Sequence, residues 1–347
     1  MVHAKISLVV VLIIILTLVS CSLKQSKPEL VHLYDYRWTL PSSPKQAIDI
    51  SQVAVELKDY DVIFFGELHN HPGVHLAQME LFAQLHRFNS KISLSMEQFE
   101  RDTQAVVDQY MAGEIGEEVL IEQARAWKHY RSSYSPLVEF ARERELPVIA
   151  ANAPKQMVVC VGRSGLKILD KYSAEERQHV AQTINAVEGA YREKYFAFLN
   201  QDSAHKSHVD DESKKIMEKM QQRSFEAQTV RDDTMAESIA HHLQQHPGRQ
   251  VLHLNGNFHS SGFLGAVERL QWRMPDLNVA VIDVIQEHEE QGQETKTLGT
   301  VLLSVRAVAD KFVQEKNRDE WLKKVMKKRM KKRKDCPTHE VFGAEKG

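Results

Sequence analysis

The sequence predicts an α/β protein in which helices flank a parallel β-sheet, with a smaller all-helical domain. Short apolar runs, of the kind found in strands buried on both faces, alternate with segments of helical spacing. A long stretch from about Ala174 to His246 shows no strand pattern, which indicates the helical domain. The chain has 347 residues, 42% of them hydrophobic, and is long enough to bury a large core.

The first part of the α/β core is expected within residues 59–154. A strand over 61–66 is followed by helical spacing over 74–88. The remaining elements are a strand at 92–96, helices at 103–111, 119–127 and 136–144, and a strand at 146–151. Strands and helices that alternate at this spacing are typical of right-handed βαβ units.

The second part of the core is expected over 249–306, after a helical domain at 155–248 that ends with Pro247-Gly248. It comprises strands at 250–254, 278–284 and 300–305, with a helix at 263–273. The polar, acidic segment 287–296 is expected to be a solvated loop.

The amino-terminal segment has the pattern of a bacterial lipoprotein signal. An apolar run over 6–19 is shorter than a membrane span, and Leu18-Val19-Ser20-Cys21 resembles the lipobox. This resemblance implies a signal peptide over 1–20 and diacylation of Cys21. In a Gram-negative cell, Ser22 after the cysteine would direct the protein to the outer membrane of the cell envelope. A plain secretory signal without lipid is the alternative.

Polar or basic segments flank the expected core. Residues 21–58 contain three prolines and are expected to be a tether, with one short strand over 31–36. The tail, 307–347, is expected to be helical or disordered, and one interpretation is contact with anionic lipid. The formal charge of the chain is −2, and residues 323–334 carry nine Lys and Arg without an acid, so the rest carries −11. This acidic body argues against a nucleic-acid-binding protein.

Cys21, Cys160 and Cys336 are too few for a disulfide framework and form no Cys-x-x-Cys pair. This excludes a zinc ribbon and a covalent haem attachment site. Stability is therefore expected to come from packing.

Polar side chains follow four predicted strands where each strand ends. In chain order they are Glu67 and His69, Glu97, Asn152, and then Asn255, Asn257 and His259. The carboxyl edge of a doubly wound sheet is where ligands bind, so we expect these residues to meet in one crevice.

Several residue types in this set suit iron or acid–base chemistry. His69 and His71 lie two residues apart, which in an extended segment places both on one side, and either imidazole could bind a metal or haem iron or could cap the next helix. Glu97 either orients a neighbouring His or takes part in chemistry itself. The absence of P-loop, Gly-x-Ser-x-Gly and His-Glu-x-x-His motifs removes the commonest nucleotide-binding, hydrolase and zincin interpretations.

Tyrosines are the other candidate ligands, because a phenolate oxygen suits ferric iron. Tyr134, Tyr191 and Tyr195 lie in aromatic segments of a chain with 7% aromatic residues. Ordinary helix packing is the alternative interpretation of each ring.

Several segments together resemble the ChaN-like haem-binding lipoproteins. They are Gly66-Glu-Leu-His69, Glu97-Gln-Phe-Glu-Arg101, Trp127 through Leu137, Pro147 through Pro154, Arg231 through Ala236, and Asn255-Gly-Asn-Phe-His259. The resemblance runs from about residue 60 to 284. The wider group includes erythromycin-esterase-like enzymes and Tiki-type metalloproteases.

The resemblance implies an iron-regulated lipoprotein and a homodimer that holds two stacked ferric haems, with a Tyr on each iron. The matched positions are Glu67, His69, Glu97, Asn152 and His259. Tyr134, Tyr191 and Tyr195 all remain candidate iron ligands, and His71 and Asn257 are further candidate haem contacts. An outer-membrane haem receptor is a candidate partner.

Two hypotheses from different classes follow. The first is a lipid-anchored protein that binds haem for iron uptake, with Arg125, Lys128 and Arg131 near the propionates. The second is a hydrolase, dependent on a divalent metal or on Glu and His alone, whose catalytic residues would be Glu67, His69, Glu97 and His259.

Overall fold

The computed structural model describes residues 29–200, 210–287, 299–331 and 336–337. The predicted signal peptide, the predicted lipid-bearing Cys21 and most of the acidic loop lie outside the described residues.

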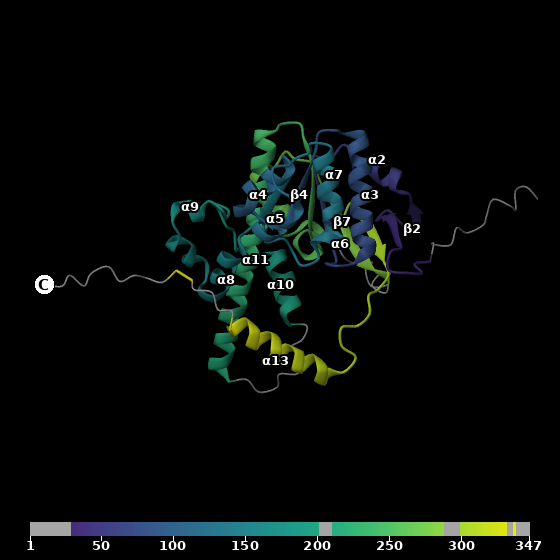
Figure 1. Ribbon diagram of the computed structural model, residues 1–347. Coiled ribbons are helices and arrows are strands. Elements are labelled where there is room, and N and C mark those ends of the chain that lie inside the picture. The colour runs from purple at the N-terminus through teal and green to yellow at the C-terminus, as the bar shows by residue number, and fades with distance from the viewer. Residues whose placement is uncertain (1–28, 201–209, 288–298, 332–335, 338–347) are drawn as a thin grey trace, which may run out of the picture.

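An eight-stranded sheet forms the centre of the molecule (Figure 1), in the order β2-β1-β8-β7-β3-β6-β4-β5. Its strands are β1 (Tyr36–Leu40), β2 (Ser43–Ile48), β3 (Val62–Glu67), β4 (Ile92–Glu100), β5 (Val148–Asn152), β6 (Gln250–Gly256), β7 (Val279–Gln286) and β8 (Val301–Val305). The six strands from β8 to β5 are parallel, as predicted. The β1 and β2 edge is antiparallel, so the expectation of a wholly parallel sheet is wrong there.

Alternate residues of the central strands face two separate apolar layers. In β3, Ile63 and Phe65 pack on one side, while Val62 and Phe64 pack on the other. The first side is covered by α2 (Ile50–Leu57), α3 (Pro72–Phe88) and α7 (Ser135–Glu143), with α4 (Gln104–Met111), α5 (Glu117–Gln123) and α6 (Tyr130–Ser133) nearby. The second side is covered by α11 (Asp211–Gln245) and α12 (Ala266–Arg273). The protein is therefore a three-layer α/β/α structure.

The tether predicted for residues 21–58 is too long. Residues 36–57 form β1, β2 and α2, and Trp38 of β1 is buried against Phe65 with ring centroids 5.8 Å apart. The prolines that suggested a tether are compatible with a sheet edge, because Pro44 lies in the outermost strand, where a missing N–H is tolerated.

The helical domain predicted for residues 155–248 is not confirmed by the structure as a separate unit. It contains α8 (Lys155–Ser164), α9 (Ala174–Arg177), α10 (Ala190–Asn200) and α11. With 35 residues, α11 is about 50 Å long, which is longer than the strands. It therefore packs both on the sheet and on the helices beyond the sheet. Its carboxyl-terminal half packs Met235 and Ile239 on the sheet, and its amino-terminal half extends beyond the sheet beside α10 (Figure 1).

A disulfide joins Cys160 of α8 to Cys336, with Cα atoms 5.6 Å apart. The expectation that stability comes from packing alone is therefore wrong. The two cysteines are 176 positions apart, and no local spacing reveals such a pair. Part of the basic tail forms α13 (Glu315–Lys331), which runs below α10 in the view of Figure 1. No helix among the described residues is long and apolar enough to cross a bilayer.

Candidate functional site

The carboxyl ends of the parallel strands bring the predicted polar residues together. Glu67 ends β3, and Glu97 lies near the end of β4. The amide nitrogen of Gly256, at the end of β6, donates to Glu97 Oε2 at 2.6 Å, and Asn152 Nδ2, at the end of β5, donates to the Glu97 carbonyl at 2.9 Å. Strands far apart in the sequence therefore form one polar edge, as expected of a doubly wound sheet.

Glu67 is a fully buried carboxylate that accepts hydrogen bonds from four side chains. Its donors are His69 Nδ1 at 2.6 Å, Tyr134 Oη at 2.7 Å, Gln78 Nε2 at 3.0 Å and Gln98 Nε2 at 3.1 Å. Burial alone would raise the pKa of Glu67, but the hydrogen bonds and the nearby His69 and His75 outweigh it and lower the pKa. Glu67 is therefore a fixed negative charge at the end of β3.

His69 presents its free ring edge to solvent. Its side chain is 43% exposed, and its ring meets Trp127 edge-on with centroids 5.0 Å apart. Burial lowers the pKa of His69, whereas the hydrogen bond to Glu67 and the charges of Glu97 and Glu67 raise it, with a net increase. A Cβ atom at Gly256 would lie 3.0 Å from His69 Nε2, so the glycine makes room for the imidazole.

A second carboxylate–imidazole pair faces the first. His259 Nδ1 donates to Asp232 Oδ1 at 2.6 Å, and the fully buried Asp232 also accepts from Tyr191 Oη at 2.7 Å. His259 Nε2 lies 3.6 Å from Glu97 Oε1. Burial lowers the pKa of His259, but the charges of Asp232 and Glu97 and the Asp232 hydrogen bond raise it overall.

Glu97 therefore lies between two imidazoles, each of which is held through Nδ1 by a buried carboxylate. This arrangement fixes the ring orientation and leaves Nε2 as the atom that a metal centre or a proton would reach. Among the described residues, no group of three or more His, Cys, Asp or Glu is placed to hold a metal ion.

The other predicted residues have different surroundings. His71 does not project beside His69, because Asn70 has a φ of 68° and turns the chain, so that expectation is wrong. His71 Nε2 instead lies 2.8 Å from the Arg306 carbonyl. Asn257 pairs with the backbone of Val284 in both directions, at 3.2 and 3.0 Å, which is a structural contact with β7.

The three candidate tyrosines are buried. Tyr134 donates to Glu67 and Tyr191 to Asp232, while Tyr195 Oη lies 2.6 Å from Ser224 Oγ. Burial, and for the first two a neighbouring carboxylate, raises the pKa of each phenol. Tyr34, which was not selected from the sequence, is 60% exposed just before β1.

Two of the three cations suggested for the propionates already have partners. Arg125 pairs with Glu100 and Asp102, and Arg131 pairs with Glu117 and Glu118; Lys128 is exposed.

Arg231 was not selected from the sequence, although it lies at the site. Its Nη1 is 3.3 Å from Asn152 Oδ1, and its charge lowers the pKa of His259. Asp232, Gln78 and Gln98 were also missed. The adjacent acids of Arg231-Asp232-Asp233, on a helix face that is otherwise buried, were the available signal for Asp232.

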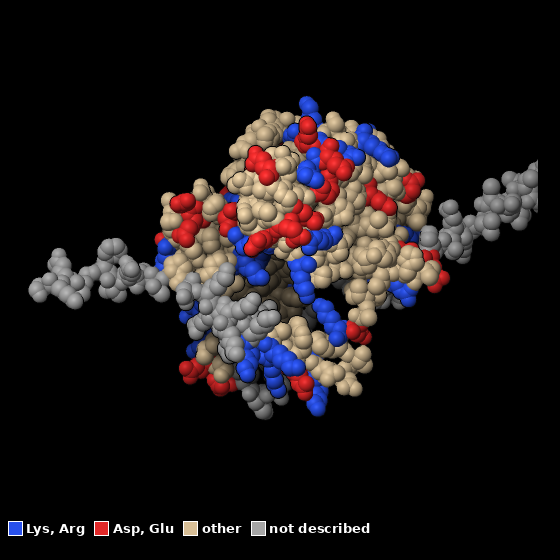
Figure 2. Space-filling view, in the orientation of Figure 1, with Lys and Arg blue, Asp and Glu red and all other residues tan. Residues whose placement is uncertain are grey.

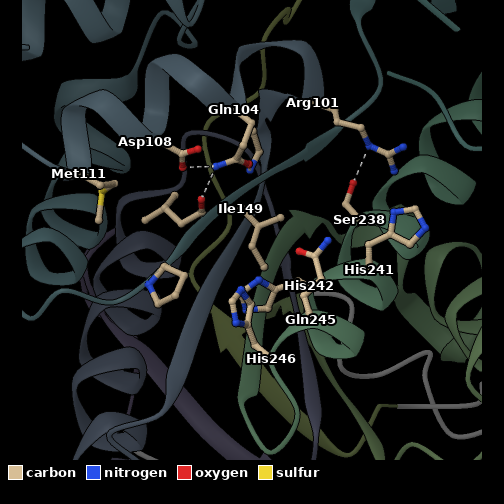
Figure 3. A pocket seen from close by; sticks show the side chains of 13 residues that line it. Arg101, Gln104, Asp108, Met111, Ile149, Ser238, His241, His242, Gln245 and His246 are labelled. Atoms are coloured by element: carbon tan, nitrogen blue, oxygen red, sulfur yellow. Dashed lines mark hydrogen bonds between the residues drawn. The ribbon is translucent and has the colours of Figure 1, made fainter. Parts of the chain in front are cut away.

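A second hollow lies away from this edge, between α4, α11 and β5 (Figure 3), with a volume of about 420 Å³. His241 and His242 of α11, and His246 just after it, line one side, and Gln104 and Asp108 of α4 line the other. None of the predicted site residues lines it.

The chain is similar to known proteins in sequence and in fold. Residues 53–270 match the family described as "Haem-binding uptake, Tiki superfamily, ChaN". No curated protein sequence matches the chain.

Among solved structures, ChaN of Campylobacter jejuni, described with cofacial haem binding, has a TM-score of 0.58 at 16% identity over 79% of this chain and 98% of that one. An erythromycin esterase mutant in its open conformation has a TM-score of 0.41 at 12% identity over 83% of this chain and 86% of that one. The first likeness shows that the fold is shared. Because the family match spans more than half of the sequence, the chain belongs to the ChaN family of haem-binding uptake proteins in the Tiki superfamily.

Proposed function

We propose that this protein binds haem at the carboxyl edge of its sheet, where His69 meets the iron, and that it serves haem uptake in the cell envelope. The observation that carries the proposal is the geometry of His69. Glu67 holds its Nδ1, while the ring is 43% exposed beside Trp127. A carboxylate on the far nitrogen orients a ligating histidine and makes it more basic.

The residues around His69 suit the other parts of a haem. Trp127 offers a flat apolar wall to a porphyrin, and Arg231 is a cation at the same edge for a propionate. When bound, the haem would supply an iron centre. The part of this chain is to orient the His69 imidazole and to keep its proton on Nδ1, shared with Glu67.

Iron ligation by a tyrosine is the competing assignment. A phenol must lose its proton to ligate ferric iron as phenolate, and the buried hydrogen bonds of Tyr134 and Tyr191 to carboxylates raise their pKa. Each would have to leave its carboxylate first. The exposed phenol of Tyr34 has no such obstacle and is the tyrosine to test beside the three candidates.

The cellular setting is also a proposal. The Cys160–Cys336 disulfide supports an oxidising compartment, in agreement with the signal-like amino terminus and its lipobox resemblance. We propose an outer-membrane lipoprotein, anchored through Cys21, that forms a homodimer around ferric haem and passes it to an outer-membrane receptor.

A haemin titration of residues 22–347, which contain every described element, tests the proposal. Saturable binding at about one haem per chain, with a shift to dimer in size-exclusion chromatography, is the expected result. His69→Ala is expected to change the absorption spectrum of the bound haem and weaken binding, whereas Tyr134→Phe, Tyr191→Phe, Tyr195→Phe and Tyr34→Phe leave the spectrum unchanged. If the spectrum changes in only one tyrosine variant, that tyrosine, and not His69, is the iron ligand. Non-saturable binding would refute the haem site altogether.

A second candidate function is hydrolysis by Glu and His. The two Nδ1-anchored imidazoles on either side of Glu97 favour it, because either Nε2 could accept a proton from water. A screen with activated esters tests it: His259→Asn and Glu97→Gln should both abolish turnover while haem titration still saturates. Wild-type turnover in both variants would exclude this site as the catalyst.

A further inference from the structure

A cationic helix, α13, has apolar side chains, Trp321 and Leu322, that the described residues leave partly exposed. We propose that α13 docks on an anionic phospholipid surface and gives the protein a membrane contact independent of any acyl chain. This contact goes beyond haem binding and uses none of the residues at the sheet edge.

The exposure of α13 is unusual for a helix of a folded protein. Such a helix normally buries one apolar stripe, and one that buries none is marginal by itself. All side chains from Glu315 to Lys324 are exposed. They include Trp321 at 49% and Leu322 at 37%, and Trp321 contacts the ring of Phe312 at 5.5 Å between centroids. The helix therefore presents an aromatic and apolar surface to a partner.

The charge of α13 selects the kind of partner. Lys323, Lys324 and Lys327 are exposed, and the segment 323–334 carries nine positive charges in a chain whose remainder carries −11. Figure 2 shows Lys and Arg side chains gathered along α13, below a hollow in the molecule. Lys beside Trp and Leu on one helix is the composition of helices that lie in the plane of a membrane interface.

Neighbouring helices extend the same kind of surface. Where α11 projects beyond the sheet, Ile216 and Met220 are 55% and 63% exposed one helical turn apart, and Lys215 and Lys219 are exposed beside them. Phe198 of α10 is 56% exposed. A bilayer with anionic headgroups offers both negative charge and an apolar layer beneath it, whereas a nucleic acid offers phosphate charge without an apolar layer for Trp321 and Leu322.

Vesicle binding by residues 22–347 tests the proposal. We expect co-sedimentation with vesicles that contain phosphatidylglycerol and little with phosphatidylcholine alone. Each Lys near an anionic surface contributes roughly a fivefold gain in binding, so the triple variant Lys323→Glu, Lys324→Glu and Lys327→Glu is expected to bind at least about a hundredfold more weakly.

A matched triple variant separates location from net charge. Lys45→Glu, Lys58→Glu and Lys91→Glu change the charge equally at exposed positions of β2, the end of α2 and the start of β4. These changes should alter vesicle binding only slightly. The wild-type tryptophan emission should shift to the blue on vesicles, and Trp321→Phe should remove that shift.

Two outcomes would overturn the proposal. In the first, both triple variants weaken binding equally. In the second, the α13 triple variant dissociates a dimer in sedimentation velocity and leaves vesicle binding unchanged, which would identify a second copy of the chain as the partner. Haemin titration of the α13 triple variant should match the wild type. Failure of the membrane-contact proposal can therefore be told apart from failure of the haem-binding proposal.

Discussion

At the residue scale, the site depends on buried charges that are fully partnered. Glu67 and Asp232 have no exposed side-chain surface, and each accepts from a histidine and a tyrosine. An unpaired buried carboxylate would be protonated or would destabilise the fold, so these donors are needed to keep the two charges. The histidines are therefore positioned by electrostatics as well as by packing.

Sequence reasoning located strand-end residues better than their helical partners. Glu67, Glu97 and His259 could be located because the strands before them are recognisable from their apolar residues, and because ligands bind at the carboxyl edge of such a sheet. Asp232 lies in the middle of a helix, and only the fold brings it to this edge. The direction of the His71 side chain was also predicted wrongly, because the residue pattern does not reveal the positive φ of Asn70.

Gly256→Ala is expected to weaken haem binding without unfolding the protein. The new Cβ would lie 3.0 Å from two atoms of the His69 ring, which has room to move because the side chain is 43% exposed. Displacement of the imidazole should change the spectrum of bound haem, measured in the haemin titration. Gly162→Ala is a suitable control, since its Cβ would meet only the Ala227 Cβ at an ordinary 3.6 Å. An unchanged spectrum of haem bound to Gly256→Ala would show that His69 is not the iron ligand.

His253 is expected to make the fold sensitive to acid. Burial lowers the pKa of this histidine from 6.5 to about 3. Between these values the unfolded chain binds a proton that the folded chain does not, so stability falls as pH falls from 6.5 towards 3. At about pH 5 the loss is about 2 kcal/mol relative to neutral pH. Urea unfolding of wild type and His253→Gln across this range measures it, and parallel pH profiles would contradict the assignment.

At the element scale, the strands that the sequence predicts correctly are those buried on both faces. Each of the six parallel strands is rich in apolar residues and is buried along almost its whole length, including β5 at the edge of the sheet. β1 and β2 were missed because the segment contains Pro41 and Pro44 beside polar residues, which an edge strand such as β2 tolerates, so its local composition matches that of a linker. α11 was assigned to one domain because helical spacing does not show which half contacts a sheet.

The opposite edge of the sheet is closed by a side chain. Gln104 Nε2 donates to the Val148 carbonyl at 2.9 Å, and Gln104 Oε1 accepts from the Ala150 amide at 2.7 Å. The side-chain amide thus takes the place of a neighbouring strand on β5, which is otherwise open to pairing with another chain.

Gln104→Ala is therefore expected to destabilise the protein and promote self-association. Loss of the two hydrogen bonds to a partly buried edge should lower the free energy of unfolding by about 1–3 kcal/mol. Urea unfolding gives the first effect and light scattering at rising concentration the second. Gln109→Ala, at an exposed position of the same helix, should do neither. If both variants behave alike, the edge does not depend on Gln104.

At the scale of the whole molecule, charge and covalent connectivity are both uneven. The acidic body carries the sheet and its site, while the basic segment lies near the carboxyl terminus. Cys336 follows α13 and is bonded to α8, so the chain on either side of α13 is attached to the body, through β8 before it and through the disulfide after it. The disulfide therefore limits how far α13 can move from the projecting ends of α10 and α11.

Reduction of the disulfide should lower stability and loosen α13 together. The bond closes a loop of 176 positions, and a disulfide over a long loop mainly restricts the unfolded chain, with a typical effect of about 2–4 kcal/mol. Urea unfolding with and without dithiothreitol measures the loss, and limited proteolysis should show faster cleavage near Lys323 and Lys324 after reduction. The double variant Cys160→Ser and Cys336→Ser should resemble the reduced wild type, and dithiothreitol should change neither its unfolding midpoint nor its cleavage rate. If reduction leaves the unfolding midpoint and the cleavage rate unchanged, the disulfide does not hold the tail, and the position of α13 must depend on its own contacts.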